Sequence, residues 1–344
     1  MAAVKIYLHK TLMKSSISSL VAFLLMAVAL SGIQKNIYAA QLHHTTAVIH
    51  ADIESETAND PYRSRFFRVR GTPNITVNTI SGDIEVFHNP EIDGVQIDLY
   101  VKRSFSLWSG TRSLDDFRII MHQQGSQIIA SVEERRSARR PGRGDVEFHF
   151  VVQVSGEAST NLKTVNGDIF LENIDGNHFL QNYNGDLIAR NIIGEVRAMS
   201  SSGNLELEGI KGSTFAKTVA GDIYSFGNSG EIRVRSVSGN IFSERTTGTF
   251  ISATTSGNID ADFLDVYDGI YAETVSGNIN LDVPVGDGYE IKSSGMRFDF
   301  TGIDQSLISE LVQSSRSSSL IIGEGAHPVQ LSTLSGTIKI SAYK

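Results

Sequence analysis

Hydrophobic and polar residues alternate along most of the chain beyond residue 70, which is the pattern of β-strands that bury one face. Between residues 164 and 282 the alternation recurs with a constant period, marked by Gly167, Gly185, Gly203, Gly221, Gly239 and Gly257, and then by Gly277 after a slightly longer interval. Each recurrence contains Gly, then Asn or Asp, then Ile or Leu, and a second glycine stands halfway through most repeats. Such a period predicts a repeat protein in which each unit forms two short strands separated by two turns.

One position of each strand is apolar in all repeats. Two residues after the first glycine stand Ile169, Leu187, Leu205, Ile223, Ile241, Ile259 and Ile279, and the equivalent residues of the other strand are Leu180, Ala198, Ala216 and Val234. No single repeat can bury these side chains, but coils stacked about 4.8 Å apart bury them as continuous columns. We therefore predict an all-β fold, a parallel β-solenoid (β-helix) of 18-residue coils flattened into two walls.

The first glycine of each repeat is predicted to be a structural turn residue, because glycine adopts a positive φ without a steric clash. This role is assigned to Gly82, Gly167, Gly185, Gly203, Gly221, Gly239, Gly257, Gly277 and Gly336. The Asn or Asp that follows can hydrogen-bond to the local backbone of the turn. A stacked column of such residues, Asp168 and Asp186 among them, could instead bind cations. We favour the turn role, because the glycine-rich motif of calcium-binding solenoids is missing.

The strand pattern continues with wider spacing between Gly71 and Val154, which predicts wider N-terminal coils with loops extruded between the strands. One of these loops contains Trp108, which either pins the loop to the solenoid or offers a platform for a sugar. The other is rich in arginine and is either a solvated hairpin tip or a site for an anionic glycan or lipid head group. Its candidate partner-binding residues are Arg135, Arg136, Arg139 and Arg140.

Apolar residues between 303 and 312 recur at helical spacing, and Asp304 is a candidate cap, so we predict one short helix near the C-terminus. On the outward side of the solenoid, aromatic and basic residues alternate from one coil to the next. These residues are Phe179, Arg197, Phe215 and Arg233. Their column is either a cation–π stack or a partner-binding surface, and we favour the stack.

Four six-residue segments share one motif: Thr79–Ile84, Thr164–Ile169, Ser236–Ile241 and Thr333–Ile338. They read T-I-S-G-D-I, T-V-N-G-D-I, S-V-S-G-N-I and T-L-S-G-T-I. An early S-G-D-I, a variable portion, a tight array and a closing S-G-x-I strand together resemble the bacterial putative-adhesin family, a β-strand-repeat domain of unknown function. The resemblance extends from Phe67 to Lys344. It implies the repeat fold and brings no catalytic residues with it.

The N-terminal segment has the features of a signal peptide. Three lysines precede an apolar stretch, Ile17–Leu30, which is shorter than the ~20 residues that span a bilayer. Cleavage after Ala39 or Ala40 would remove this segment, whereas an uncleaved segment would act as an anchor. We divide the chain into a signal peptide (1–40), an N-terminal β portion with long loops (41–163) and regular solenoid repeats (164–344). We expect export to the periplasm or the cell surface, with no transmembrane segment after cleavage.

Composition narrows the chemistry that the chain can perform. Cysteine is absent, so disulfides, thiolate metal sites and cysteine nucleophiles are excluded. The nine histidines show none of the close spacings of zinc ligands, and no cofactor is expected. The formal net charge of −8 argues against nucleic acid as a partner.

These features favour a non-enzymatic module of the cell envelope that binds a protein or polymer partner, because a rigid rod offers long flat faces and few pockets. A polysaccharide-acting β-helix enzyme is an alternative, and its candidate acids are Glu206, Glu208, Glu244, Asp260, Asp262 and Asp282. Hydrolysis needs two carboxylates about 5–9.5 Å apart in a cleft, whereas these acids are predicted to form an open face. A sensor module for envelope stress is a further alternative that the sequence does not separate from the first.

Overall fold

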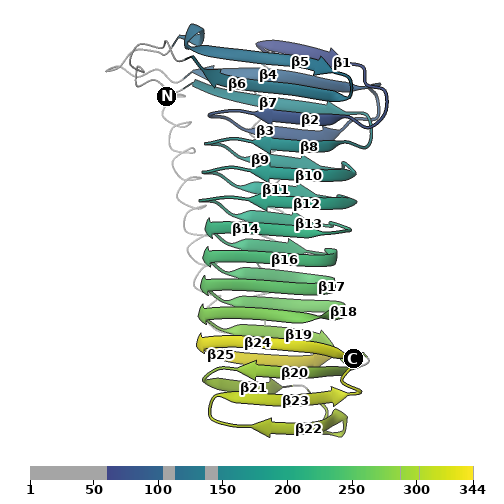
Figure 1. Ribbon diagram of the computed structural model, residues 1–344, viewed down its shortest axis with the longest axis vertical. Helices are drawn as coiled ribbons and strands as arrows, with labels where there is room; N and C mark the ends of the chain where they lie inside the picture. The colour runs from purple at the N-terminus through teal and green to yellow at the C-terminus, as the bar shows by residue number, and fades with distance from the viewer. Residues whose placement is uncertain (1–59, 104–112, 136–145, 287, 302, 344) are drawn as a thin grey trace, which may run out of the picture. The chain divides into compact units, whose positions relative to one another are not determined.

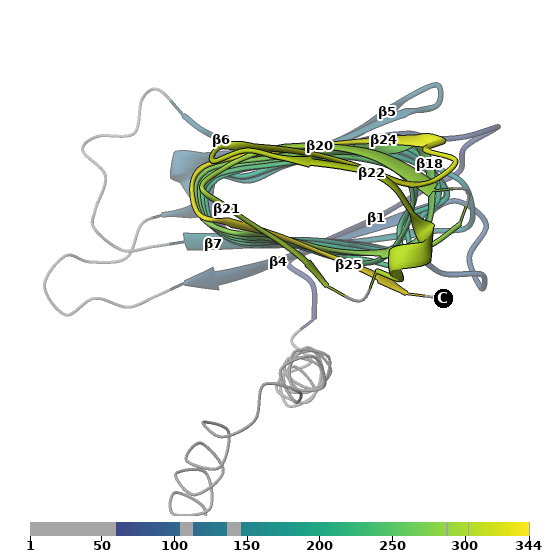
Figure 2. The same cartoon turned by 90° about the horizontal axis from the view of Figure 1, so that it is seen from below.

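The computed structural model describes residues 60–103, 113–135, 146–286, 288–301 and 303–343. Its secondary structure lies in one compact unit, Pro61–Lys344. The strands of this unit coil into a stack with two facing walls, which Figure 1 shows from the side and Figure 2 shows end-on. The unit is therefore all-β and solenoid-like, as the alternation predicts.

We name the walls by their strands, in stacking order from the N-terminal end. Wall 1 contains β5 (Phe117–Gln124), β6 (Gln127–Glu134), β2 (Asn74–Asn78), β8 (Ser159–Lys163), β10 (Gly176–Gln181), β12 (Gly194–Met199), β14 (Thr214–Ala220), β16 (Ser229–Ser238), β24 (His327–Ser335), β20 (Gly288–Ser294), β23 (Ser317–Gly323) and β22 (Ile308–Gln313). Wall 2 contains β1 (Arg63–Phe67), β4 (Val95–Arg103), β7 (Val146–Val154), β3 (Ile84–His88), β9 (Ile169–Glu172), β11 (Leu187–Arg190), β13 (Leu205–Glu208), β15 (Ile223–Phe226), β19 (Ile279–Pro284), β25 (Thr337–Tyr343) and β21 (Arg297–Thr301). Two long strands, β17 (Ile241–Ser256) and β18 (Ile259–Ser276), run through both walls after β15 and β16.

Strands of the central array pair in parallel with the equivalent strand one coil away. Gly176 of β10 lies opposite Gly194 of β12, and Leu187 of β11 lies opposite Leu205 of β13. The two members of each pair are separated by one full repeat, so equivalent residues stack. The coil from Gly257 to Gly277 is two residues longer, and register shifts between β17 and β18 absorb the difference.

The inward columns predicted from the alternation form the core. All of the following side chains are fully buried: Ile169, Leu187, Leu205, Ile223, Ile241, Ile259, Ile279, Leu180, Ala198, Ala216 and Val234. His178 is also buried in wall 1, where its Nε2 donates to the Ile174 carbonyl at 3.0 Å and its Nδ1 accepts from the Thr160 hydroxyl at 3.0 Å. Burial lowers the pKa of His178 to about 4, so the ring is neutral and serves the core as a polar cross-link.

The nine predicted turn glycines stack in a single column along the solenoid, and all of them except Gly336 have the predicted positive φ. At Gly221, φ is +149° and a Cβ atom would lie 2.0 Å from the carbonyl oxygen of Gly203 in the preceding coil. A side chain is therefore excluded by the neighbouring backbone as well as by the local conformation. The column includes distant residues, since Gly167 stacks on Gly82 and Gly336 stacks on Gly277.

A buried hydroxyl three residues before the glycine completes the turn. Thr218 donates to the Gly203 carbonyl at 3.1 Å, and Thr254 donates to the Gly239 carbonyl at 3.0 Å. These bonds satisfy glycine carbonyls that the close approach of the coils buries. The equivalent side chains that make the same bond are Thr164, Asn182, Ser236, Thr274 and Thr333, whereas the buried Ser200 hydroxyl makes none.

The N-terminal end of the solenoid combines one parallel coil with antiparallel strands. The β2–β3 coil is followed on its outer side by β6 and β7, which pair with it in parallel. Beyond them, β5 is antiparallel to β6, β4 to β7 and β1 to β4. The expectation of wider parallel coils is therefore wrong for β1, β4 and β5. The antiparallel strands cover the strand edges that the outermost N-terminal coil would otherwise expose.

The C-terminal end also departs from sequence order. The last coil, β24–β25, lies between β18–β19 and β20–β21, and it pairs in parallel with both. Gly336 rather than Gly295 consequently continues the glycine column.

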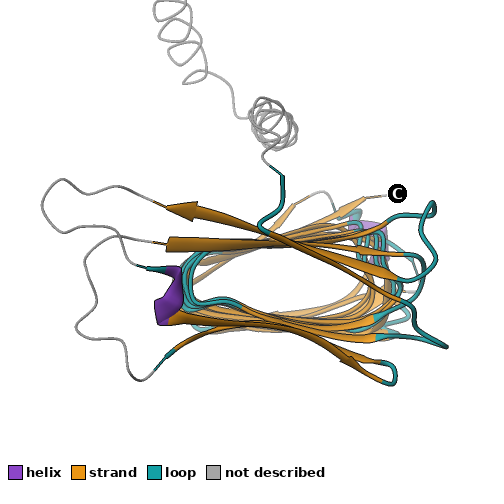
Figure 3. Ribbon diagram, turned by 90° about the horizontal axis from the view of Figure 1, so that it is seen from above, coloured by secondary structure: helices purple, strands orange, loops and turns teal. Residues whose placement is uncertain are grey.

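The predicted C-terminal helix is wrong. Residues Gln305–Leu307 form a single 3₁₀ turn, η4, and the next six residues form β22, which is antiparallel to β23. Asp304 does cap the turn by accepting from the backbone N–H of Ser306 at 2.9 Å. The other helical turn of the described residues is η3 (Leu114–Asp116), and Figure 3 shows strands through nearly all the rest. Pairing with the free edge of β23 outweighs the helical spacing of the apolar residues.

The glycine column predicts that a side chain at one of its positions destabilises the fold. Replacing Gly221 by valine should lower the free energy of unfolding by more than ~2 kcal/mol, because the new side chain meets the Gly203 backbone at a positive φ. Urea denaturation followed by circular dichroism measures the change. The control Lys217→Val, at an exposed outward position of β14, should cost less than ~0.5 kcal/mol. Equal losses in the two variants would contradict the role of the column.

Candidate functional site

The outward face of wall 1 carries the column that the sequence singles out. Phe179 pairs with Arg197, Arg197 with Phe215, and Phe215 with Arg233 on β10, β12, β14 and β16. The two arginines are exposed and the two phenylalanines are half-buried. We call this set the aromatic–arginine column.

The charges of this column are not arranged as a simple cation–π stack. The guanidinium of Arg197 pairs with Glu195, and that of Arg233 pairs with Glu231 at 2.6 Å, each two residues back on its own strand. The cation that lies over the Phe179 ring is Lys163, 5.2 Å from the ring centre. Because these pairs are exposed, each stabilises the fold by well under ~1 kcal/mol. Both arginine side chains therefore face solvent and are only weakly held by these pairs.

Two depressions follow the column along wall 1. The smaller, about 340 Å³, lies at Ser213 and Phe215 between the ion pairs of Arg197 and Arg233. The larger, about 680 Å³, lies farther along and is here called the C-terminal groove. It begins at Arg235 and Ile251 and extends over β17, β18, β24, β20 and β23 to Val312 of β22.

The groove runs between two rows of outward residues that stack from strand to strand. The first row continues the aromatic–arginine column and consists of Ile251, Tyr271, Gln330 and Lys292. The second row consists of Arg235, Ala253, Glu273, Ser332 and Ser294. Sequence reasoning missed this site because β24 is inserted between β18 and β20. The only signal of that insertion is the place of Gly336 in the glycine column.

Of the other predicted partner-binding residues, the structure describes Arg135. Arg135 is exposed, and its backbone N–H donates to the Asp116 carbonyl at 2.8 Å. Trp108, Arg136, Arg139 and Arg140 lie outside the described residues. Their binding role stays a prediction.

The six candidate acids lie on the outward face of wall 2, away from both depressions, and none of them is buried. Arg190 pairs with Glu206, and its Nε lies 3.4 Å from Glu208. Burial, with the nearby charge of Asp282, raises the pKa of Asp262. Wall 2 also carries an aromatic stack that the sequence analysis missed, Tyr224 over Phe242 at 5.2 Å, although their separation by one full repeat was a usable signal.

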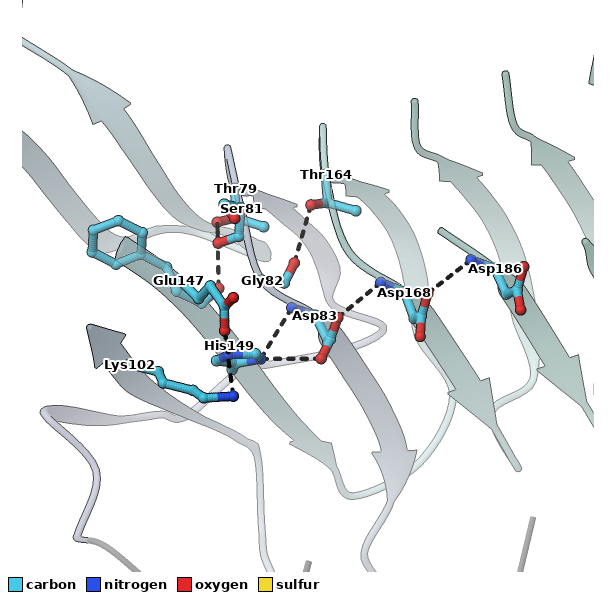
Figure 4. A network of polar contacts seen from close by, with 11 residues as sticks. Thr79, Ser81, Gly82, Asp83, Lys102, Glu147, His149, Thr164, Asp168 and Asp186 are labelled. Atoms are coloured by element: carbon cyan, nitrogen blue, oxygen red, sulfur yellow. Dashed lines mark hydrogen bonds and ion pairs between the residues drawn. The ribbon is translucent and has the colours of Figure 1, made fainter. Parts of the chain in front are cut away.

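A ladder of side-chain hydrogen bonds connects the coils at the start of wall 2, as Figure 4 shows at its N-terminal end. Oδ1 of Asp83 accepts from the backbone N–H of Asp168 at 2.8 Å, and Oδ1 of Asp168 accepts from that of Asp186 at 2.8 Å. The series continues through Asn204, Asp222, Asn240, Asn258, Asn278 and Thr337. The Asn and Asp residues therefore bond to the next coil, where the sequence predicted bonds to their own turn.

His149 of β7 closes this ladder at its N-terminal end (Figure 4). Its Nδ1 lies 3.1 Å from Oδ2 of Asp83, and its Nε2 lies 3.3 Å from Oε2 of Glu147, which Lys102 approaches at 3.6 Å. The hydrogen bond to Asp83 raises the pKa of His149, and the Glu147 carboxylate adds to this effect. Burial alone would raise the pKa of Asp83, but the bonds from His149 and the Asp168 backbone lower it.

Within the described part of the chain, no three His, Asp or Glu side chains gather closely enough to hold a metal ion. Nor does any helix in those ranges have the length and hydropathy needed to cross a membrane.

Comparison with known proteins decides the family. The model of the Toastrack DUF4097 family matches residues 71–341. The chain belongs to this family. The resemblance to the putative-adhesin repeat family is thereby confirmed.

Several solved structures are similar to this Toastrack chain at low identity. One is a putative adhesin from Bacteroides fragilis, with 14% identity over 81% of this chain and 96% of that chain and a TM-score of 0.36. Another is a putative cell adhesion protein from Clostridium sporogenes, with 10% identity over 82% and 98% and a TM-score of 0.23. A third is a putative lipid binding protein from Parabacteroides distasonis, with 12% identity over 65% and 97% and a TM-score of 0.31. None of the curated proteins matches the chain.

The His149 cluster of this Toastrack chain predicts a specific pH dependence. Because the folded pKa of His149 lies above the ordinary value of 6.5, the protonated ring contributes stability that is fully present below about pH 6.5. That contribution is lost as the pH rises through the folded pKa. In urea denaturation between about pH 6 and about pH 9, His149→Gln should flatten the fall in stability by up to ~1 kcal/mol. The control His122→Gln, at an exposed position of β5, should follow the parent protein, and a parental slope in His149→Gln would refute the assignment.

Proposed function

We propose that this protein is an exported, non-enzymatic, adhesin-like module of the cell envelope that binds an extended partner along the outer face of wall 1. The observation that carries this proposal is the alignment of both depressions with the aromatic–arginine column on one wall. Strand stacking places an outward side chain of this row about every 4.8 Å, so a long partner meets one such side chain at each coil. Aromatic and arginine side chains are also those that contribute most to binding at interfaces.

The arrangement of carboxylates supports a binding role over hydrolysis. Among the described residues that line the C-terminal groove, Glu273 is the single acid. Glycoside hydrolysis uses two carboxylates that flank the bond to be broken. The acids proposed for such a reaction, Glu244 and Asp260 among them, lie on the other wall. Asp260 there accepts a hydrogen bond from Asn280 at 2.5 Å.

Export is the part of the proposal that rests on the sequence. A basic start, the apolar stretch Ile17–Leu30 and small residues near position 40 together have the form of a signal peptide. The envelope is where a rod without a catalytic centre can meet a long polymer or a surface protein.

Export predicts a processed N-terminus. Mass spectrometry of the protein isolated from the periplasm or the medium should find that the chain begins at Ala40 or Gln41. A chain that begins at Met1 and resides in the cytosol would contradict the proposed compartment.

The binding face predicts a separation of binding from stability. The double variant Phe179→Ser, Phe215→Ser removes half-buried rings from the outer surface without opening the core, so its thermal midpoint should move by only a few degrees. Its co-sedimentation with an envelope fraction of the source organism should fall at least tenfold, because exposed aromatic anchors dominate such interfaces. Phe226→Ser, at an exposed ring on wall 2, is the matched control and should bind like the parent protein. Normal binding by the double variant would place the function elsewhere.

A further inference from the structure

The C-terminal groove has a composition that distinguishes it from the rest of wall 1. Its second row becomes small and hydroxylated beyond Glu273, where Ser332, Ser294 and Ser317 follow one another on β24, β20 and β23. Ser319 of β23 is paired with Lys292 in the first row. Hydroxyl groups therefore follow one another along the second row at the spacing of the strands, and the first row adds those of Tyr271 and Ser319. Each of these groups can donate and accept hydrogen bonds.

The middle of the groove brings an aromatic ring together with polar groups. Tyr271 is half-buried between Ile251 and Gln330, and Glu273 stands two residues beyond it on the same strand. Tyrosine offers a rigid apolar face with a polar tip. A ring of this kind beside an amide, a carboxylate and hydroxyls matches a sugar, which has an apolar C–H face and a rim of hydroxyl groups.

The charges of the groove nearly balance. Arg235 lies at one end, Glu273 lies in the middle, and Lys292 lies four strands from Arg235. The Lys292 ammonium pairs with Glu290 at 2.6 Å, so part of its charge is already compensated. Arg235 and Lys292 are the cations among the described residues that line the groove, so a polyanion would find few positive charges there. The balance favours a partner that is recognised through hydroxyl groups rather than through charge.

The dimensions of the groove favour a chain over a single sugar. From β16 to β22 it crosses six strand spacings, which is roughly 29 Å. Its direction is along the stack, so a linear polymer lying in it crosses one strand after another. Its volume of about 680 Å³ is within the range of pockets that hold small organic ligands.

We propose that the C-terminal groove is a subsite for a neutral polysaccharide that lies along the solenoid. Tyr271 is the platform for one sugar ring, the Glu273 carboxylate accepts hydrogen bonds from its hydroxyl groups, and the Gln330 amide donates to them or accepts from them. The serines of β24, β20 and β23 form hydrogen bonds with the hydroxyl groups of the next sugars along the polymer. This inference rests on the proposed binding role of wall 1 and names the class of its partner.

Affinity electrophoresis of the full-length protein tests the proposal directly. The probes are soluble polysaccharides cast into the gel: dextran, a mixed-linkage β-glucan, galactomannan and xyloglucan as neutral chains, and alginate as an acidic one. At least one neutral chain should retard the protein, with a retardation that added salt leaves unchanged. Retardation by alginate alone, or by none of the probes, would overturn the assignment of a neutral polysaccharide.

Variants identify the groove as the place of binding. Tyr271→Ala and Gln330→Ala should each weaken binding of the neutral chain at least tenfold. The matched control Tyr183→Ala, at an exposed tyrosine outside the groove, should bind like the parent protein. Gln330 is exposed, so its variant tests the groove even if Tyr271→Ala does not fold. The proposal would be overturned if Gln330→Ala and every folded Tyr271 variant bound the neutral polysaccharide as tightly as the parent protein does.

Co-sedimentation with the envelope fraction distinguishes this inference from the proposed function. If Tyr271→Ala and Gln330→Ala bind the envelope normally while the Phe179 and Phe215 double variant does not, the groove assignment fails and the wall 1 function stands. If all three variants bind the envelope normally, both proposals fail. Loss of both envelope and polysaccharide binding in the groove variants supports both.

Discussion

Adjacent coils approach each other closely at the glycine column, where each glycine after Gly82 lies against the carbonyl of the glycine in the neighbouring coil. At Gly221 this approach leaves no room for a Cβ atom. The close backbone contact sets the register for the whole coil, because every other residue then stacks on its counterpart. The buried hydroxyl of Thr218 and the Asp222 side chain use the same register, since each bonds to a backbone group of a neighbouring coil. The motif is therefore mainly a set of contacts between coils.

Fixed register also explains why the two walls differ in chemistry. A substitution on an outward position changes one place in a row without disturbing the coil, so each row can acquire its own character. On wall 2, acidic side chains surround the Tyr224 and Phe242 stack. Wall 1 instead carries ion pairs, hydroxyl groups and one long groove. The groove exists because small residues such as Ala253 and Ser332 occupy a row whose earlier members include Lys217 and Arg235.

The repeat fold, its inward columns and its nine turn glycines could be predicted from the sequence, because all three depend on a period that recurs along the chain. Features that depend on pairing between distant segments could not. The residues of β22 have the spacing of a helix, yet they pair with the edge of β23. The groove joins Tyr271, Gln330 and Lys292, whose order in space differs from their order in the chain. Counting hydrophobic positions also fails for the apolar residues that stand two positions before the column glycines. Val219 and Leu334 are examples, and both are exposed because they lie at a corner of the coil.

The insertion of β24–β25 between coils that precede it in the chain has a consequence for biosynthesis. The segment His327–Tyr343 is synthesised after the strands that lie on either side of it in the stack. Until it is made, β18 and β20 have no common neighbour, and the β22–β23 hairpin, which pairs with β20, is not joined to the earlier coils. The coils up to β18–β19 can therefore form one after another as the chain emerges, whereas the seam between β18–β19 and β20–β21 closes only after β24 and β25 have been made. A chain that stopped before His327 would be left with an open seam rather than a shorter rod.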